Sequence, residues 1–461
     1  YLPAALPAIG AVFVNKPDSH WSESPEEVAS FRAALLDFYD RHGRALPWRE
    51  SNDPYAILVS EIMAQQTRVE TVVSYYERWL ERFPTFAALA AAPEDDVLKE
   101  WEGLGYYSRA RNLHRAAKVV RERHGGRLPE SALELRDLPG VGPYTAGAVA
   151  SIAFDRAEPA VDGNVRRVYA RLFDEASPIP REVERWAARV VDPARPGDFN
   201  QALMELGATV CTPRRPSCER CPVASWCRAL EEGTAELRPS PRRRSPVRQE
   251  VRAVAVLVRR GRGGAPPTGR ATKESGRRIR GGERREIAGE RREAVGDRFL
   301  VRRRPAEGLL AGMWDFPSIS AEEGDTDARI VERVRELARR RGLGADGGRV
   351  LSPVPHQFSH LRVEYRAVLL EVASPPAGAQ AQAPTEGETE AAANAATAHA
   401  DAATAAAAEA ARERAEAHAP PSATDEAERW VGVADLDRLA LPVAQQKIFR
   451  LALDAWRGSV D

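Results

Sequence analysis

The chain has 461 residues, enough for two or more domains that each bury a core of their own. Its 67 basic and 67 acidic residues cancel, so any affinity for nucleic acid must come from local patches rather than overall charge. Only four cysteines occur, which excludes a disulfide-rich secreted scaffold. No apolar run reaches the about 20 residues that span a bilayer, and the first residues lack the basic start of a signal peptide. We therefore expect a cytoplasmic protein without membrane contact, associated with the nucleoid if it is bacterial.

The first half of the chain has the pattern of an all-α domain. Residues 1–25 form a lead-in broken by prolines, and helical periodicity with little strand-like alternation runs over residues 26–230. Residues 231–249 are rich in Arg, Pro and Ser and centre on a run of three arginines. This composition predicts a basic linker between two domains.

The second half, residues 250–461, has the pattern of an α+β domain. Runs rich in β-branched residues, such as 251–258 and 363–372, predict strands, and a helical stretch lies between them. Two segments without an apolar stripe interrupt the domain, a Gly- and Arg-rich one at about 261–296 and an Ala-rich one at about 374–425. We interpret both as insertions that do not contribute to the core.

The stretch from Leu138 to Asp162 combines a glycine turn, a helix and an isolated acid. Gly140 and Gly142 allow the turn to bring backbone N–H groups close to another molecule, and small residues predict a helix directly after it. Such N–H groups at a helix N-terminus attract anions, and a DNA phosphate is one candidate. An ordinary corner between helices with a surface Asp explains the same pattern, so both interpretations stay open.

The four cysteines lie together, at Cys211, Cys218, Cys221 and Cys227. So many thiols in one Pro-rich segment predict coordination of a metal or cluster. Four thiolates also suit a tetrahedral zinc ion, but zinc ribbons usually have two Cys-x2-Cys pairs and this chain has one. The spacing alone therefore favours a four-iron cluster modestly, and leaves zinc as the alternative.

The cysteine spacing, placed after a glycine hairpin and a following Asp, resembles the endonuclease III superfamily of helix–hairpin–helix DNA glycosylases. The resemblance implies that the four cysteines hold a [4Fe–4S] cluster with a structural or redox-sensing role. It also implies two helical lobes with a cleft between them, and the hairpin glycines Gly140 and Gly142 as contacts to the DNA backbone.

Glu61 is the candidate general acid. It lies within an apolar helical segment between Ile57 and Met63, where a carboxylate is costly unless it is paired or protonated. A raised pKa suits an acid catalyst, whereas a Glu on a helix surface would have no such role. Asp162 is the candidate carboxylate, because cleavage of a glycosidic bond uses one acid and one group that stabilises an oxocarbenium-like sugar. Only the resemblance implies that the two converge.

Three segments narrow the resemblance to adenine DNA glycosylases of the MutY type. Residues 60–68 resemble their acid-bearing helix, 103–111 their minor-groove wedge loop and 161–165 their catalytic Asp segment, and the likeness covers roughly residues 25–230. It implies that Glu61 protonates adenine and that Asp162 stabilises or transiently traps the sugar cation.

The resemblance also assigns the remaining residues of this site. Tyr144 occupies the position where bifunctional relatives have a lysine that forms a Schiff base, so we expect a monofunctional enzyme. Of Tyr106 and Tyr107, we expect one to be core and Tyr106 to be the wedge. The resemblance implies that Tyr144 and Asn164 support catalysis. It implies that the extruded adenine is held by Arg44, Trp48 and Gln201. It further implies that the DNA bases are contacted or separated by Gln66, Thr67 and Tyr106.

In the second domain, residues 308–317 resemble the signature of the Nudix-like C-terminal domain of the same family. A Nudix hydrolase holds its metal ions with closely spaced Glu residues on one helix. The acids after Pro317 lack this spacing, so we expect the domain to have a binding role rather than pyrophosphohydrolase activity. Phe358, Ser359 and His360 resemble the family's reader of the damaged base, with Ser359 and His360 weighted above Phe358.

Together these features predict a monomeric enzyme that removes adenine paired with 8-oxoguanine, or with guanine, in double-stranded DNA. Three alternatives remain at this stage. They are an endonuclease III-like glycosylase and lyase acting on oxidised pyrimidines, a catalytically idle lesion-binding protein, and nucleotide hydrolysis by the second domain.

Overall fold

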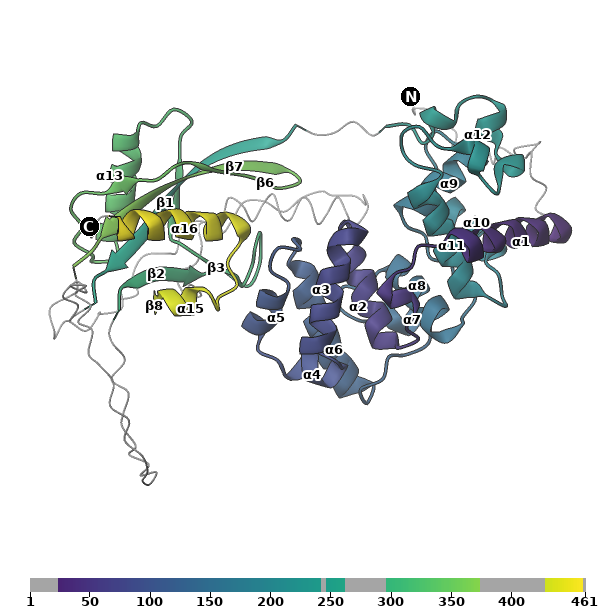
Figure 1. Cartoon of the computed structure of the whole chain (residues 1–461), viewed down its shortest axis with the longest axis horizontal. Coiled ribbons are helices and arrows are strands. Elements are labelled where there is room, and N and C mark those ends of the chain that lie inside the picture. The colour runs from purple at the N-terminus through teal and green to yellow at the C-terminus, as the bar shows by residue number, and fades with distance from the viewer. Residues whose placement is uncertain (1–23, 242–245, 262–295, 374–427, 459–461) are drawn as a thin grey trace, which may run out of the picture. The chain divides into compact units, whose positions relative to one another are not determined.

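The structure is a computed structural model that describes residues 24–241, 246–261, 296–373 and 428–458 (Figure 1). It divides into two compact units, Tyr1–Ala92 with Arg109–Arg244, and Pro93–Ser108 with Ser245–Asp461. We call them the helical unit and the mixed unit. Most of the predicted lead-in and both predicted insertions lie outside the described residues.

Every regular element described in the helical unit is a helix, which confirms the all-α prediction. The α-helices are α1 (Pro25–His42), α2 (Pro54–Ala64), α3 (Val69–Arg82), α4 (Phe86–Ala91), α6 (Ser108–Arg123), α7 (Ala132–Leu135), α8 (Pro143–Phe154), α9 (Gly163–Leu172), α10 (Pro180–Val190), α11 (Pro196–Thr209) and α12 (Arg228–Glu231). Short 3₁₀ helices are η1 (Pro47–Arg49), η2 (Cys218–Arg220), η3 (Ala224–Trp226) and η4 (Ala235–Leu237). No described helix is long and apolar enough to cross a membrane.

Local sequence explains where the functional helices begin. The side chain of Asp53 accepts a hydrogen bond from the Tyr55 N–H at 3.0 Å, and Pro54 takes the first position of α2, where a missing N–H costs nothing. Helix α8 likewise has a proline, Pro143, at its first position, but its N-cap Gly142 makes no side-chain hydrogen bond. Both helices are apolar on nearly every side and are therefore buried among their neighbours.

The mixed unit contains α5 (Glu94–Glu100) and an eight-stranded sheet flanked by helices. Its strands are β1 (Arg248–Arg259), β2 (Arg298–Arg303), β3 (Trp314–Asp315), β4 (Ser318–Ala321), β5 (Arg349–Val350), β6 (Val354–Gln357), β7 (Leu361–Glu371) and β8 (Glu428–Gly432), and its other helices are α13 (Asp327–Arg339), α15 (Val433–Leu436) and α16 (Val443–Arg457). The central pair β1 and β7 is parallel, whereas the remaining pairs are antiparallel, so the α+β prediction is confirmed.

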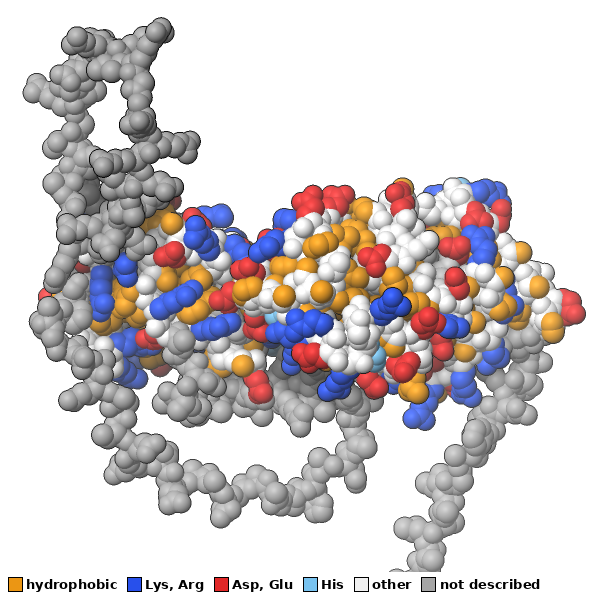
Figure 2. All heavy atoms as spheres, turned by 90° about the horizontal axis from the view of Figure 1, so that it is seen from below, with side chains coloured by type: hydrophobic (Ala, Val, Ile, Leu, Met, Phe, Trp, Pro, Cys, Tyr) orange, Lys and Arg blue, Asp and Glu red, His pale blue; other side chains and the backbone are white. Residues whose placement is uncertain are grey.

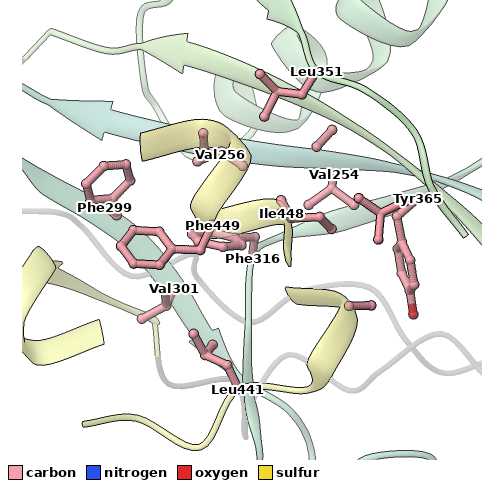
Figure 3. Close-up of a cluster of buried hydrophobic side chains, with 14 of the residues drawn as sticks. Val254, Val256, Phe299, Val301, Phe316, Leu351, Tyr365, Leu441, Ile448 and Phe449 are labelled. Carbon is pink, nitrogen blue, oxygen red and sulfur yellow. The ribbon is translucent and has the colours of Figure 1, made fainter. Parts of the chain in front are cut away.

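Alternate side chains of β1 belong to the two hydrophobic cores of the mixed unit. Val254 and Val256 belong to the cluster that α16 completes with Ile448 and Phe449, whose ring meets that of Phe299 at 5.5 Å (Figure 3). The alternate residues of β1 belong to a second cluster with α13. Because successive side chains of a strand point to opposite faces, α13 and α16 cover opposite faces of the sheet.

Two boundaries differ from those expected from composition. Residues 93–108 form part of the mixed unit, where the Lys99 ammonium donates to the Leu439 carbonyl at 3.3 Å and the Leu441 N–H donates to Glu102 at 3.0 Å. The first part of the predicted linker is held on the helical unit, because Arg238 forms an ion pair with Asp174 at 2.8 Å. Charged side chains of both signs alternate over the surface seen in Figure 2, in keeping with the balanced composition.

Candidate active site

Glu61 lies inside α2 with a relative exposure of 8%. Burial raises the pKa of its carboxyl group from 4.5 to about 7; the hydrogen bond from Tyr144 opposes this rise, and the nearby negative charge of Asp162 adds to it. Arg49 lowers the pKa through its positive charge. The side chain therefore exchanges a proton near neutral pH, which is the range that general acid catalysis needs.

The hydroxyl group of Tyr144 is the hydrogen-bond partner of Glu61. It donates to Glu61 Oε2 at 2.6 Å and also lies 3.2 Å from Met204 Sδ. Burial, together with the negative charges of Glu61 and Asp162, raises the pKa of Tyr144 well above its usual value, so the phenol stays protonated. Tyr144 thus joins α8 to α2 across 83 residues of sequence and presents a neutral donor to the acid.

Asp162 is the N-cap of α9, with a partly buried carboxylate held by two donors. Its Oδ1 accepts from the Val165 N–H at 2.7 Å, and its Oδ2 accepts from the Asn164 amide at 2.7 Å. Burial raises the pKa of Asp162, while these hydrogen bonds and the charge of Arg167 lower it. More groups oppose the effect of burial at Asp162 than at Glu61, so Asp162 is the carboxylate better suited to stay charged.

Arg167, which the sequence analysis did not identify, orients Asn164. One of its nitrogens, Nη2, donates to Asn164 Oδ1 at 2.8 Å and to the Gly207 carbonyl at 2.7 Å, and Nε donates to the Cys211 carbonyl at 2.8 Å. With its oxygen engaged by Arg167, the Asn164 amide must turn its nitrogen toward Asp162. The signal in the sequence was the i, i+3 spacing of Asn164 and Arg167 on one helix face.

A buried carboxylate, Glu205 on α11, ties together two arginines near this site. Arg44 binds it through two hydrogen bonds of 2.7 and 3.0 Å, and Arg49 adds a third of 2.8 Å. Burial alone would raise the pKa of Glu205, but the two guanidinium groups outweigh it and lower the pKa. Glu205 was not identified from the sequence, although an acid inside an apolar helix is the same signal that identified Glu61.

The adenine contacts implied by the resemblance stay predictions. Arg44 is engaged by Glu205, and Trp48 meets the ring of Tyr76 at 5.5 Å in an edge-to-face contact. Gln201 is buried on α11, the helix that carries Glu205. These residues therefore belong to the same unit as Glu61.

The glycine hairpin and the turn after α2 have the backbone shapes that the sequence analysis expects. Gly140 has a φ of 79°, and a Cβ there would lie 2.5 Å from Asn112, so only glycine fits. Gly142 is exposed and is the N-cap of α8, which has no side-chain cap at this end. Gln66 is exposed with a φ of 54°, and Thr67 beside it is half-buried.

The two tyrosines of the wedge loop separate as expected. Tyr107 is a core residue whose hydroxyl accepts from the Gly103 N–H at 3.1 Å, whereas Tyr106 is 46% exposed with a φ of 47°. A large exposed aromatic ring on a strained backbone suits a residue that contacts DNA. The wedge role itself stays a prediction.

The four cysteines lie in one loop after α11, each half-buried. Burial and, after it, the negative charges of the other three thiols raise the pKa of Cys221 to about 12, so the four sulfur atoms influence one another. The buried Arg171 guanidinium donates to Cys211 Sγ at 3.2 Å, as suits a thiolate ligand. The loop brings together the four thiol ligands that an iron–sulfur cluster uses.

In the mixed unit, Phe358, Ser359 and His360 form the turn between β6 and β7. The Phe358 N–H donates to the Leu361 carbonyl at 2.7 Å and closes the hairpin. Ser359 and His360 are exposed, with Ser359 Oγ 3.3 Å from His360 Nδ1, while Phe358 packs on the core and meets the ring of His356 at 4.5 Å. Strand β7 begins at Leu361, earlier than the apolar pattern indicates, because β1 extends the parallel ladder to Arg248.

The acids that follow the Nudix-like signature have arginine partners. On α13, Glu332 pairs with Arg339 and lies 3.6 Å from Arg335, and Glu336 pairs with Arg340 at 3.1 Å. These carboxylates line the exposed faces of the helix and neutralise its arginines.

These features of the helical unit, a glycine hairpin, a buried acid electrostatically coupled to the Asp that caps α9, and a four-cysteine loop, define a helix–hairpin–helix DNA glycosylase. Family models agree: residues 59–193 match the HhH-GPD superfamily of base excision DNA repair proteins, 211–227 the iron–sulfur binding domain of endonuclease III and 292–451 the NUDIX domain. The cofactor of the cysteine loop is a [4Fe–4S] cluster. The protein is thus a DNA N-glycosylase of base excision repair.

Relatives identify the family within this class. Adenine DNA glycosylase of Homo sapiens is 40% identical over 75% of this chain and 68% of its own length, and that of Mycobacterium tuberculosis is 44% identical over 45% and 70%. A solved thermostable thymine-DNA glycosylase is 31% identical, with a TM-score of 0.43 over 45% of this chain and 98% of its own. The chain belongs to the adenine DNA glycosylase family.

Proposed function

We propose that this enzyme removes adenine from pairs with 8-oxoguanine, and less efficiently with guanine, in double-stranded DNA. One observation carries the proposal. A carboxylic acid with a pKa of about 7, Glu61, is hydrogen-bonded by the neutral phenol Tyr144 and electrostatically coupled to the Asp162 carboxylate. One proton donor and one anion are the two groups that cleavage of an N-glycosidic bond needs.

In the proposed reaction, Glu61 protonates the extruded adenine. A carboxyl group with a pKa of about 7 makes both the proton donor and its conjugate base accessible near neutral pH. Protonation lets adenine leave as a neutral base. Once the base has left, the Glu61 carboxylate accepts a proton from the attacking water, and the acid is regenerated.

The Asp162 carboxylate faces the positive charge that develops on the sugar. Its two fixed donors, Asn164 and the Val165 N–H, hold it in one orientation without transferring a proton to it. A preoriented anion stabilises an oxocarbenium-like sugar at little reorganisation cost. Transient bonding of the carboxylate to the sugar is compatible with the same geometry.

The enzyme is proposed to be monofunctional. A lyase needs an amine that forms a Schiff base with the sugar, and Tyr144 supplies a phenol in that position. No lysine occurs between Lys118 and Lys273, a stretch that includes the hairpin, Asp162 and the cysteine loop. The product is therefore an abasic site with an intact strand.

Recognition of the damaged base is assigned to the hairpin turn of the mixed unit. Ser359 and His360 expose a hydroxyl and an imidazole on a turn that the Phe358 N–H and its core packing hold in place. Such groups offer hydrogen bonds to the edge of an oxidised guanine. We further propose that the enzyme acts as a monomer in the cytoplasm.

The test uses duplexes that carry adenine opposite 8-oxoguanine, guanine or thymine. The enzyme should release adenine from the first two and leave strand breaks only after alkali treatment. Glu61→Gln should abolish release while the variant still binds the duplex, and Glu77→Gln, an exposed acid on α3, is the matched control. Excision by Glu61→Gln at the rate of the control would refute the assignment of the acid, and strand cleavage without alkali would refute the monofunctional mechanism.

A further inference from the structure

We infer that Arg109 is a positioning residue for base extrusion, because its guanidinium group fixes the turn that presents Gln66. The inference deepens the proposed function, on which it rests, since Gln66 is one of the residues expected to enter the base stack. Arg109 is the second residue of α6 and its side chain is only 7% exposed. None of the catalytic steps described above uses it.

The Arg109 guanidinium group binds the C-terminal end of α2. Its nitrogen Nη1 lies 3.0 Å from the Ile62 carbonyl oxygen, 2.8 Å from that of Met63 and 2.5 Å from that of Gln65. Helix α2 ends at Ala64, so these carbonyl groups are among those that its own N–H groups do not satisfy. A buried cation at this end is also favoured by the helix dipole.

The same group also holds the residue on the far side of Gln66. The other terminal nitrogen, Nη2, donates to Thr67 Oγ1 at 3.0 Å, so Arg109 binds both neighbours of Gln66 in the chain. A second anchor comes from α8, where Thr145 Oγ1 accepts from the Gln65 side-chain amide at 3.1 Å. The flanking residues are therefore fixed at three atoms, Gln65 O, Gln65 Nε2 and Thr67 Oγ1, while Gln66 itself is exposed.

Gln66 has a φ of 54°, in the left-handed region that residues with a Cβ rarely adopt. A residue in that region keeps its shape only where its surroundings impose it. The planar fork of Arg109 supplies this constraint, because it fixes the carbonyl before Gln66 and the hydroxyl after it at once. A lysine ammonium group has no such fork.

The role of a fixed turn follows from the expected task of Gln66. A side chain that fills the space left by an extruded base must be aimed at the stack before the base leaves, or its ordering costs free energy at that moment. Arg109 removes this cost in advance. Loss of the fork should therefore slow extrusion and leave the proton chemistry of Glu61 unchanged.

The experiment measures extrusion without excision. All proteins carry Glu61→Gln, and 2-aminopurine replaces the target adenine opposite 8-oxoguanine, so that its fluorescence rises when it leaves the stack. Arg109→Lys should slow this rise about tenfold. Arg121→Lys, the same change at an exposed position of α6, should not alter it. Thr67→Val, which removes only the hydroxyl group, should act in the same direction more weakly.

Rescue separates positioning from a general loss of structure. Asparagine adopts the left-handed region more readily than glutamine and keeps an amide, so adding Gln66→Asn to Arg109→Lys should restore most of the rate. Gln66→Gly also permits the turn but has no side chain, and should not restore it. Unchanged extrusion in Arg109→Lys, a slow rise that Gln66→Asn leaves slow, or rescue by Gln66→Gly would each overturn the inference.

Failure of the proposed function gives different results. If the enzyme with Glu61 intact releases no adenine, or if Glu61→Gln alone gives no fluorescence rise, the function is wrong. If both behave as expected and Arg109→Lys matches Arg121→Lys, only the role of Arg109 is wrong. Thermal unfolding and the visible absorbance of the cluster, compared across the variants, identify any that fail to fold, and Thr67→Val then carries the test.

Discussion

Glu61→Gln should stabilise the helical unit at alkaline pH, because it removes a carboxylate that is costly to ionise in its buried position. The rise of the Glu61 pKa from 4.5 to about 7 corresponds to roughly 3 kcal/mol between the two protonation states. A carboxyl group whose pKa is raised by folding contributes its stability below the unfolded value of 4.5. It loses that contribution as pH rises through the folded value.

The magnitude then depends on pH in a defined way. At pH 8 the folded wild-type unit bears nearly the whole cost of ionising the buried carboxyl group. The free energy of unfolding of Glu61→Gln minus that of wild type should therefore be greater at pH 8 than at low pH by roughly 3 kcal/mol. At pH 5 most of this advantage should be absent, about 1 kcal/mol or less remaining. Glutamine is neutral at both pH values, so the change of the difference between pH 5 and pH 8 isolates the proton.

The assay is denaturant unfolding followed through the visible absorbance of the iron–sulfur cluster, which reports the helical unit alone. Glu77→Gln serves as the control, because Glu77 is exposed. If the gain in free energy of unfolding from Glu61→Gln is equal at pH 5 and pH 8, or greater at pH 5, then Glu61 is not a buried acid with a raised pKa.

Other side chains give further expectations. Tyr144→Phe removes a hydrogen bond that lowers the pKa of Glu61, so the alkaline limb of a single-turnover pH profile should move up by about one pH unit; no movement, while Tyr75→Phe is also unchanged, would contradict this. Glu205→Gln leaves two guanidinium groups without their buried partner and should lower the free energy of unfolding by about 3 kcal/mol at pH 7, and by less below pH 4.5; an equal loss at both pH values would exclude an ionic cause. Ser359→Ala should weaken binding to 8-oxoguanine duplexes about tenfold and to guanine duplexes less, as fluorescence anisotropy titration can show; equal losses would refute the reader role.

The helices and strands were largely predictable because their signals are local. Helix α8 follows from a glycine turn and a run of small residues, and β1 from six apolar residues in succession, 253–258. Glu61 was identifiable for the same reason, since its neighbours in the chain are the apolar residues that bury it. The sequence therefore carried the fold class and the acid without any knowledge of distant contacts.

The partners of the acid were not predictable from local pattern. Tyr144 meets Glu61 across 83 residues, and Arg44 meets Glu205 across 161. Their side chains look like ordinary surface or core residues within their own segments. The position of residues 93–108 with the mixed unit is a similar case, because Lys99 and Glu102 bind backbone groups more than 300 residues away. Only the resemblance gave Tyr144 a role in advance, and nothing gave one to Glu205.

The orientation of the Asp162 carboxylate depends on an approach between helices that only glycine permits. A Cβ at Gly207 on α11 would lie 2.5 Å from the Cβ of Asn164 on α9. Because this position has no side chain, Asn164 can sit against α11, and its amide reaches both Asp162 and Arg167. Arg167 in turn donates to the Gly207 carbonyl, so the same residue provides the space and one of the acceptors. A side chain at position 207 would displace the Asn164 amide without contacting either catalytic carboxylate. The orientation of the Asp162 carboxylate thus depends partly on the missing side chain of Gly207, a residue that takes no part in the reaction itself.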